Sequence, residues 1–253
     1  MTRVITVISG KGGVGKTTTV TNLGLALMKH GHNIIILDAN VTTPNLSLHL
    51  GIPFYPVTIH DVLRGNADPS EAIYYHESGL KIIPASLKTD DLAENNIEKL
   101  HQIMLNLLGR ADIIIIDAAA GLGKEALAAI NVADEIVVVT NPEMPAVTDA
   151  LKTIKVAEQF GTPVLGVVVN RYKGLKHEMT VDSIRSMLER EILSIVPEDI
   201  AVPRSIAEKT PVVKHRPTSK SSREFRKLAA RISGSEFVEK DENWFERFFG
   251  WMV

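Results

Sequence analysis

Short apolar runs rich in β-branched residues alternate with helical patterns along most of the chain. Such runs are typical of parallel strands that are buried on both faces. The alternation predicts βαβ units, and hence a single α/β domain with a mostly parallel, twisted sheet of about seven or eight strands and helices on both faces. The expected strands are Val4–Ile8, Asn33–Leu37, Leu80–Ile83, Ile113–Ile116, Ile136–Val139, Val164–Val169 and Ile192–Val196.

A glycine-rich loop follows the first expected strand and precedes a helical pattern from Thr18 to His30. It matches G-x-x-x-x-G-K-[ST] in the order strand, loop, helix that a P-loop requires. Glycines bring backbone N–H groups close to phosphate oxygens, and the helix N-terminus faces the same anion. Lys16 is expected to reach the β- and γ-phosphates, and the Thr17 hydroxyl to bind Mg²⁺. The expected nucleotide-binding residues here are Gly10, Lys11, Gly12, Gly13, Val14, Gly15, Lys16, Thr17 and Thr18.

Acidic residues follow two of the expected strands, where α/β sheets bind their ligands. Asp117 closes a run of four isoleucines and is expected to hold Mg²⁺ directly or through water. Asp38 follows the second strand and can join the water shell of the same ion, although a cap for a helix or turn is the simpler interpretation. Asp112 begins the isoleucine run, and we expect it to be structural.

Composition narrows the function classes. The chain has 253 residues, 45% of them hydrophobic, which suffices for one large core. It contains no cysteine, which excludes disulfides, thiolate zinc sites and iron–sulfur ligation. A net charge of −2 argues against wholesale nucleic-acid binding, though not against a local basic patch. We expect a cytoplasmic protein, because the chain starts directly in a strand and no run approaches the length of a membrane span.

The loop K-G-G-V-G-K-T resembles the deviant Walker A loop of the ParA/MinD superfamily, and the chain up to about Ile232 resembles the archaeal MinD-type ATPases. In that family the first lysine, here Lys11, crosses a dimer interface to the nucleotide of the other subunit. The resemblance therefore implies a homodimer joined by ATP, with Lys11, Lys16, Asp38 and Asn40 as catalytic residues. A solvated loop lysine is the alternative for Lys11.

Two switch segments depart from the family pattern. MinD proteins usually have D-x-D after the second strand, and Asn40 stands where the second aspartate positions the attacking water. An asparagine can orient water but carries no charge, so we expect slow hydrolysis and a long-lived dimer. The sequence Asp117-Ala118-Ala119-Ala120-Gly121 lacks the family's proline. We expect a looser loop in which the Gly121 N–H still lies near the γ-phosphate.

Further segments resemble the family at the base-binding side. Asn170 and Arg171 follow a strand, and an asparagine there can recognise adenine, although a turn residue is the alternative. Pro197, Glu198 and Asp199 are similar to the I-P-E-D loop that borders the base. The segment from Val139 to Glu143 matches V-T-N-P-E, which by itself supports only a helix start.

The segment from Pro53 to Glu77 resembles two family elements, and we expect two short amphipathic helices beside the sheet. They cover Val57–Leu63 and Glu71–Tyr75. His60, Tyr74 and Tyr75 are interpreted as packing residues rather than ligands.

The C-terminal part divides into a basic helix and an aromatic tail. Seven lysines and arginines lie between Lys214 and Arg231, and Phe225, Leu228, Ala229 and Ile232 share one helical face. A solvated basic face is the usual explanation, and anionic lipid headgroups or DNA phosphates are alternatives. Residues 1–232 are thus expected to form the ATPase domain, 233–235 a flexible break, and 236–253 an amphipathic aromatic helix. The aromatic and apolar tail residues expected to meet a membrane are Trp244, Phe245, Phe248, Phe249, Trp251 and Met252.

This tail resembles the membrane-targeting helix of MinD proteins but carries five acids against Lys240 and Arg247, so attachment would depend on buried aromatic surface. Docking on a partner or back on the domain are the other outcomes. The resemblance implies an ATPase, with ATP or ADP and Mg²⁺ bound, that positions an unidentified cargo or activator on a membrane. The alternatives are a ParA-like partition ATPase that holds DNA through residues 214–231, and a small-molecule amidotransferase or kinase, for which the sequence has no inserted substrate segment.

Overall fold

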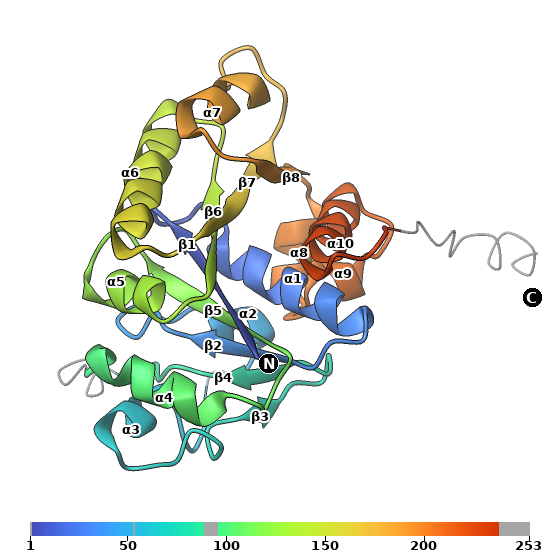
Figure 1. Cartoon of the computed structure of the whole chain (residues 1–253). Coiled ribbons are helices and arrows are strands. Elements are labelled where there is room, and N and C mark those ends of the chain that lie inside the picture. The colour runs from blue at the N-terminus through green and yellow to red at the C-terminus, as the bar shows by residue number, and fades with distance from the viewer. Residues whose placement is uncertain (1, 53, 89–95, 238–253) are drawn as a thin grey trace, which may run out of the picture.

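One twisted sheet runs through the centre of the protein (Figure 1). The computed structural model describes residues 2–52, 54–88 and 96–237. Within them, eight strands lie in the order β3-β4-β2-β5-β1-β6-β7-β8. All neighbours are parallel except β3 and β4. The strands are β1 (Arg3–Ser9), β2 (Ile34–Asp38), β3 (Tyr74–Tyr75), β4 (Lys81–Ile83), β5 (Ile113–Ala120), β6 (Glu135–Thr140), β7 (Val164–Tyr172) and β8 (Ile192–Pro197).

Helices cover both faces of the sheet (Figure 1), which confirms the predicted fold class. On one face, apolar residues of α1 (Lys16–Lys29), α2 (Leu46–Leu50), α8 (Ala201–Ala207), α9 (Val212–His215) and α10 (Lys220–Ser233) enter one hydrophobic cluster. The other face carries α3 (Ile59–Arg64), a 3₁₀ turn (Ile97–Lys99), α4 (Leu100–Leu107), α5 (Lys124–Asn131), α6 (Met144–Phe160) and α7 (Val181–Leu188).

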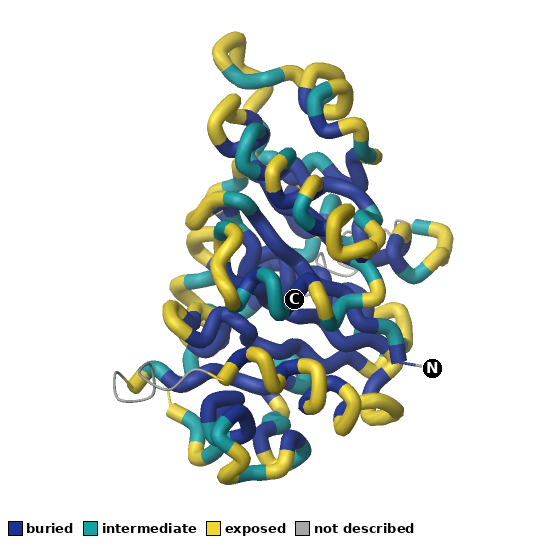
Figure 2. Tube along the Cα trace, turned by 60° about the vertical axis from the view of Figure 1, so that its left-hand side comes forward, coloured by how far each residue is buried: buried dark blue, intermediate teal, exposed yellow. Residues whose placement is uncertain are grey.

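The isoleucine run of β5 explains why the sheet needs both layers. Ile113 and Ile115 pack into the cluster on the α1 side, whereas Ile114 and Ile116 pack into the cluster on the α5 side. Successive side chains of a strand point to opposite faces, so a strand that is apolar at every position must be covered twice. Figure 2 accordingly shows buried strands inside a layer of helices whose outer sides are exposed.

Two helices were predicted between Pro53 and Glu77, and the prediction of the second one is wrong. The first, α3, is present, but Tyr74 and Tyr75 form the antiparallel edge strand β3, paired with Ile82 and Lys81. Aromatic side chains favour strands, and the Tyr74 hydroxyl accepts a hydrogen bond from the Val57 N–H at 2.9 Å. The local helical pattern is overridden by these tertiary contacts.

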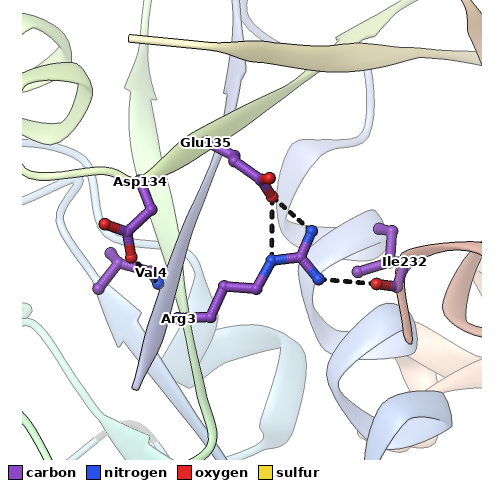
Figure 3. Close-up of polar contacts among 5 residues, drawn as sticks. All are labelled: Arg3, Val4, Asp134, Glu135 and Ile232. Carbon is purple, nitrogen blue, oxygen red and sulfur yellow. Dashed lines mark hydrogen bonds and ion pairs between the residues drawn. The ribbon is translucent and has the colours of Figure 1, made fainter. Parts of the chain in front are cut away.

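Polar contacts hold the beginnings of β1 and β6 to the end of α10 (Figure 3). The Arg3 guanidinium donates to the Glu135 carboxylate at 3.0 Å and to the Ile232 carbonyl at 2.7 Å. Beside it, the Asp134 carboxylate accepts from the Val4 N–H at 2.7 Å. The last turn of α10 is thereby fixed at the end of the sheet where the central strands β1 and β6 begin, opposite the P-loop.

Among the described residues, no helix combines the length and hydropathy that crossing a bilayer would require. The basic segment is not one helix: Lys214 lies in α9, Arg216 follows it, and α10 begins only at Lys220. Phe225, Leu228, Ala229 and Ile232 are buried on the inner side of α10 as expected. The aromatic tail residues from Trp244 to Met252 lie outside the described residues, so the predicted division into residues 1–232, 233–235 and 236–253 stays a prediction.

Candidate nucleotide site

The P-loop between β1 and α1 depends on glycine at two positions for different reasons. Gly15, the residue before α1, has φ of 99°, a left-handed conformation that side chains disfavour. A Cβ there would lie 2.1 Å from the Asn170 amide nitrogen. A Cβ on Gly10 would lie 2.3 Å from the backbone oxygen of Asp149 in α6. The loop therefore fits between α6 and the end of β7 only without side chains at these points.

Two carboxylates lie side by side beneath this loop. Asp38 and Asp117 are register partners on the adjacent strands β2 and β5, and both are buried. The Asp38 carboxylate accepts from the N–H groups of Asn40 at 3.1 Å and Leu46 at 3.2 Å. The Thr17 hydroxyl donates to one Asp117 oxygen at 2.6 Å. The other Asp117 oxygen, Oδ1, is buried and has no hydrogen-bond partner among the described residues.

Burial raises the pKa of Asp38 well above the ordinary value, and the neighbouring Asp117 raises it further. Burial also raises the pKa of Asp117, although the Lys16 ammonium and the Thr17 hydroxyl partly offset this effect. Lys16 likewise opposes the rise at Asp38. Two adjacent buried acids that share the electrostatic influence of one lysine are therefore short of positive charge.

These oxygens fit a magnesium ion. Mg²⁺ prefers one or two carboxylates, together with hydroxyl, water and phosphate oxygens. Asp117 Oδ1 is the unsatisfied acceptor that such an ion would use, and Thr17 and Asp38 are adjacent to it. The three residues predicted to bind the metal are thus brought together at one point.

The acid pair predicts how the stability of the nucleotide-free protein depends on pH. Because the pKa of each acid is higher in the fold than in the unfolded chain, the fold keeps protons that the unfolded chain releases. Below the unfolded pKa this contribution is fully present, and it is lost as pH rises through the raised folded pKa. We expect the urea unfolding free energy of the wild type to fall more steeply than that of Asp38→Asn as the pH rises above the ordinary aspartate pKa toward the raised folded values.

The matched control is Asp182→Asn, because this carboxylate on α7 is 89% exposed. Its pH profile should follow that of the wild type. If the pH profile of Asp38→Asn also follows that of the wild type when Mg²⁺ and nucleotide are absent, the acid pair does not destabilise the fold at higher pH.

A cavity of about 590 Å³ opens beside the acid pair. Its walls come from the P-loop, the segment after β2 and the segment after β5, which are the parts that surround a terminal phosphate in a P-loop protein. The lining residues are Gly12, Gly13, Lys16, Asn40, Thr42, Thr43, Asn45, Ile97, Ala119, Ala120, Gly123, Lys124 and Glu125.

Asn40 is buried in the wall of this cavity and is held by its own loop. Its amide nitrogen donates to the Thr43 carbonyl, and its amide oxygen accepts from the Thr43 hydroxyl at 3.0 Å. The neighbouring threonine, Thr42, donates a hydrogen bond across the cavity to Glu125 at the start of α5. Asn40 therefore borders the space where a γ-phosphate and water would lie, with a fixed side-chain orientation.

The prediction of a looser loop after Asp117 is wrong. Without the proline, β5 continues to Ala120, which is the register partner of Ser9 on β1. The Gly121 N–H donates to the Ser9 carbonyl at 2.9 Å and is therefore engaged in the sheet rather than directed at a phosphate. A proline would have removed a backbone donor and ended the strand earlier. The segment is more ordered than expected, and the turn begins only at Gly121.

A second cavity, of about 210 Å³, lies at the ends of β7 and β8. It brings together all the residues predicted to contact the base. Asn170, however, donates its amide nitrogen to the Val14 carbonyl at 2.7 Å, and Asp199 accepts from the Ala201 and Ser221 N–H groups. Both side chains thus also hold the cavity wall. The lining residues are Thr18, Asn170, Arg171, Pro197, Glu198, Asp199, Val202, Pro203 and Ile206.

Lys11 lies apart from both cavities. Its ammonium is 3.8 Å from the Glu143 carboxylate, and its side chain is 50% exposed. It lines neither cavity, whereas Lys16 lines the larger one. The two lysines of the loop therefore point to different places.

Sequence reasoning missed several supporting residues. Asn141, after β6, can donate its amide nitrogen to the Val14 carbonyl at 3.2 Å and to the Asn170 carbonyl at 3.3 Å. Asn22 in α1 accepts from the Val213 N–H at 3.0 Å, which ties α9 to the helix of the P-loop. Because Asn141 directly follows a strand, its sequence position could have indicated a place in the site. No sequence pattern could have indicated the bond from Thr42 to Glu125, because the two residues are far apart in the chain.

The comparisons with known proteins agree with this geometry. The family model described as ParA, NUBPL iron-transfer P-loop NTPase, matches residues 1–233. The septum site-determining protein MinD of Thermotoga maritima is 39% identical over 247 residues, which cover 92% of this chain and 89% of that protein. The absence of cysteine leaves no thiolate ligands for the iron chemistry in the family description.

Solved structures agree as well. MinD of Pyrococcus horikoshii complexed with Mg-ADP is 35% identical, with a TM-score of 0.88 over 92% of this chain and 96% of that one. The MinC:MinD cell division protein complex of Aquifex aeolicus matches with 30% identity and a TM-score of 0.83, over 94% of this chain and 98% of that one.

Proposed function

Because the chain belongs to the ParA/MinD family of P-loop ATPases, we propose that it is an ATP-dependent dimerising switch that positions a partner protein on a membrane. ATP and Mg²⁺ occupy the P-loop, the acid pair and the two cavities. The residues proposed to bind ATP and Mg²⁺ are the nucleotide-binding and metal-binding residues predicted from the sequence. When bound, Mg²⁺ supplies positive charge to the phosphate oxygens.

The position of Lys11 carries the dimer proposal. Its side chain is half exposed, lies outside both cavities of its own subunit and is paired only loosely with Glu143 at 3.8 Å. A phosphate of a second subunit would be a stronger partner than this exposed carboxylate, because charge-assisted contacts strengthen when water is excluded. ATP in each subunit would then bind the Lys11 of the other.

The proposed chemistry in the larger cavity is hydrolysis of the γ-phosphate. Phosphoryl transfer depends on positioning and on charge stabilisation. Lys16 supplies a fixed positive charge from its largely buried position, and Asn40 can orient the attacking water. Asn40 cannot attract a proton as a carboxylate would, and its amide is already engaged with Thr43. We therefore propose slow turnover.

Steady-state ATPase of Asn40→Asp tests this proposal. The carboxylate cannot donate to the Thr43 carbonyl, so one oxygen is released toward the cavity and accepts more strongly from water. We expect turnover to rise by about tenfold, equivalent to about 1.4 kcal/mol of activation free energy. Asn45→Asp, on the wall of the same cavity, is the control for added negative charge. Brisk wild-type hydrolysis that Asn40→Asp leaves unchanged would contradict the assignment.

The aromatic C-terminal tail is the proposed membrane contact. Its apolar face carries two tryptophans and three phenylalanines. A large side chain contributes about 1.5–3 kcal/mol when fully buried, and less when half immersed. One tail would bind reversibly, whereas two tails in one dimer would bind together and gain by avidity. Membrane residence would thereby follow the nucleotide state.

Liposome flotation tests this link. We expect the full-length protein to float with vesicles several-fold more with ATP than with ADP, and a truncation after Ser235 to remain in the dense fraction in both states. The truncation should still bind nucleotide, because both cavities lie within the described residues before Ser233. Equal flotation of the truncated protein would remove the tail from the proposal.

A protein partner is also proposed, since the relative from Aquifex aeolicus was solved as a MinC:MinD complex. An affinity pull-down in the ATP state would identify this partner. DNA binding through residues 214–231 is the weaker proposal, because the relatives described above, at 30% identity or more, are MinD proteins.

A further inference from the structure

His60 is a buried histidine that lines neither of the two cavities. It lies in the first turn of α3, and only 1% of it is exposed. Its Nδ1 accepts a hydrogen bond from the Ser86 N–H at 3.0 Å, so Nε2 is the nitrogen that donates to the Val41 carbonyl, at 3.1 Å. The imidazole thereby joins the segment that follows β4 to the segment that follows β2.

The start of α3 is itself fixed to the segment that follows β4. The Ile59 N–H donates to the Pro84 carbonyl at 2.8 Å. Thr58 and Asp61 form a capping box, in which the Asp61 carboxylate accepts from the Thr58 N–H at 2.8 Å. The imidazole therefore extends toward Val41 from a helix end whose position is already determined by other contacts.

Val41 belongs to residues 39–45, called here the β2 loop. It lies between Asn40 and Thr42, which both line the larger cavity. The Asp38 carboxylate accepts from backbone N–H groups near both ends of this loop. The imidazole holds a carbonyl between these ends, next to the residue that borders the proposed position of the attacking water.

The bonds within the β2 loop cannot replace this contact. Asn40 and Thr43 are bonded to each other, which fixes the Asn40 amide relative to the loop but not the loop relative to the sheet. The bond from the imidazole to Val41 comes from outside the loop. Because it is buried, it is electrostatically stronger than an equivalent bond that water can reach.

We propose that His60 is a positioning residue for ATP hydrolysis: through the Val41 carbonyl, it holds the β2 loop where the Asn40 amide can orient the attacking water. The proposal rests on the proposed function, since it requires hydrolysis in the larger cavity. It also goes beyond the packing role predicted for His60 from the sequence. Phosphoryl transfer depends on positioning, so a displaced loop should lower turnover, whereas nucleotide affinity should change little.

Two amide substitutions separate the two bonds of the imidazole. The glutamine amide nitrogen extends from the backbone about as far as Nε2, whereas the asparagine amide extends only about as far as Nδ1. His60→Gln can therefore still donate to the Val41 carbonyl, and His60→Asn can still accept from the Ser86 N–H but does not reach Val41. Both replace a buried ring with an amide, and urea unfolding of each shows how much the whole fold is destabilised.

Steady-state ATPase is the first readout. We expect His60→Asn to lower kcat by about tenfold and to leave KM within about twofold, whereas His60→Gln should keep kcat within about threefold of the wild type. His101→Asn, at an exposed histidine of α4, is the matched control and should change neither constant. A purely structural role for His60 would make the glutamine and asparagine variants lose activity alike.

Hydrogen exchange of the β2 loop, measured by mass spectrometry, is the second readout and does not depend on turnover. We expect the amides of residues 39–46 to exchange several-fold faster in His60→Asn than in His60→Gln, while β5 exchanges alike in both. If the wild type hydrolyses no ATP, the proposed function fails, and the exchange comparison alone decides whether His60 holds the loop. The proposal for His60 is overturned if His60→Asn keeps wild-type kcat and exchange, or if both variants lose them equally.

Discussion

Replacing Lys16 with alanine is expected to weaken ATP binding by more than 100-fold. Lys16 lines the larger cavity, and its ammonium opposes the rise in the pKa of both Asp38 and Asp117. Two charge-assisted contacts with phosphate contribute about 1.5–3 kcal/mol each, and about 2.8 kcal/mol corresponds to 100-fold in affinity. Isothermal titration with Mg·ATP measures the effect. Lys124→Ala, on the opposite wall of the cavity, is the control and should weaken binding by less than about tenfold.

A second substitution separates binding from folding. Without Lys16, the buried acids lose their cation, so Lys16→Ala should also lower the unfolding free energy at pH 8. Lys16→Ala/Asp38→Asn removes one of the two acids and should recover much of that stability while still failing to bind ATP. Recovery of binding in the double variant, or near-normal binding in the single one, would show that Lys16 is not the phosphate ligand.

Replacing Lys11 with alanine is expected to abolish ATP-dependent self-association while the monomer keeps its affinity for nucleotide within about threefold. The side chain lies outside both cavities of its own subunit, so its loss should spare binding there. Removing one partner of a buried charge pair between subunits costs about 2–5 kcal/mol, which lowers the association constant by at least about 30-fold. Sedimentation velocity with Mg·ATP, together with titration calorimetry, measures both quantities.

Lys152→Ala provides the matched control, because Lys152 is an exposed lysine of α6 that pairs with Asp149 within its own subunit. It should self-associate like the wild type. Unchanged association of Lys11→Ala would overturn the dimer proposal, and equal loss of nucleotide affinity and association would show that Lys11 acts within its own subunit.

The pattern of apolar residues predicted the sheet well, because central parallel strands must be apolar on both faces. The run Ile113–Ile116 indicates such a strand by itself. Strand ends were less predictable: β5 reaches Ala120 because Ala120 is the register partner of Ser9, a residue on a strand distant in sequence. Tyr74 and Tyr75 became an edge strand for the same reason, since their partners lie on β4.

The candidate site was predictable where one short motif contains its residues. The loop from Gly10 to Thr17 and the acids at strand ends could be inferred from spacing and from the rule that ligands bind at the carboxyl ends of strands. The structure adds contacts between distant segments, such as the Asn170 amide on the Val14 carbonyl and Thr42 on Glu125. Spacing carries no information about these contacts because the fold alone brings the partners together.

The central claim is that two copies of this chain associate only around ATP and Mg²⁺. Multi-angle light scattering of the wild-type protein with saturating Mg·ATP measures this directly. The predicted result is twice the mass of the chain with ATP and the mass of one chain with ADP or without nucleotide. A single-chain mass at saturating ATP and magnesium would contradict the account.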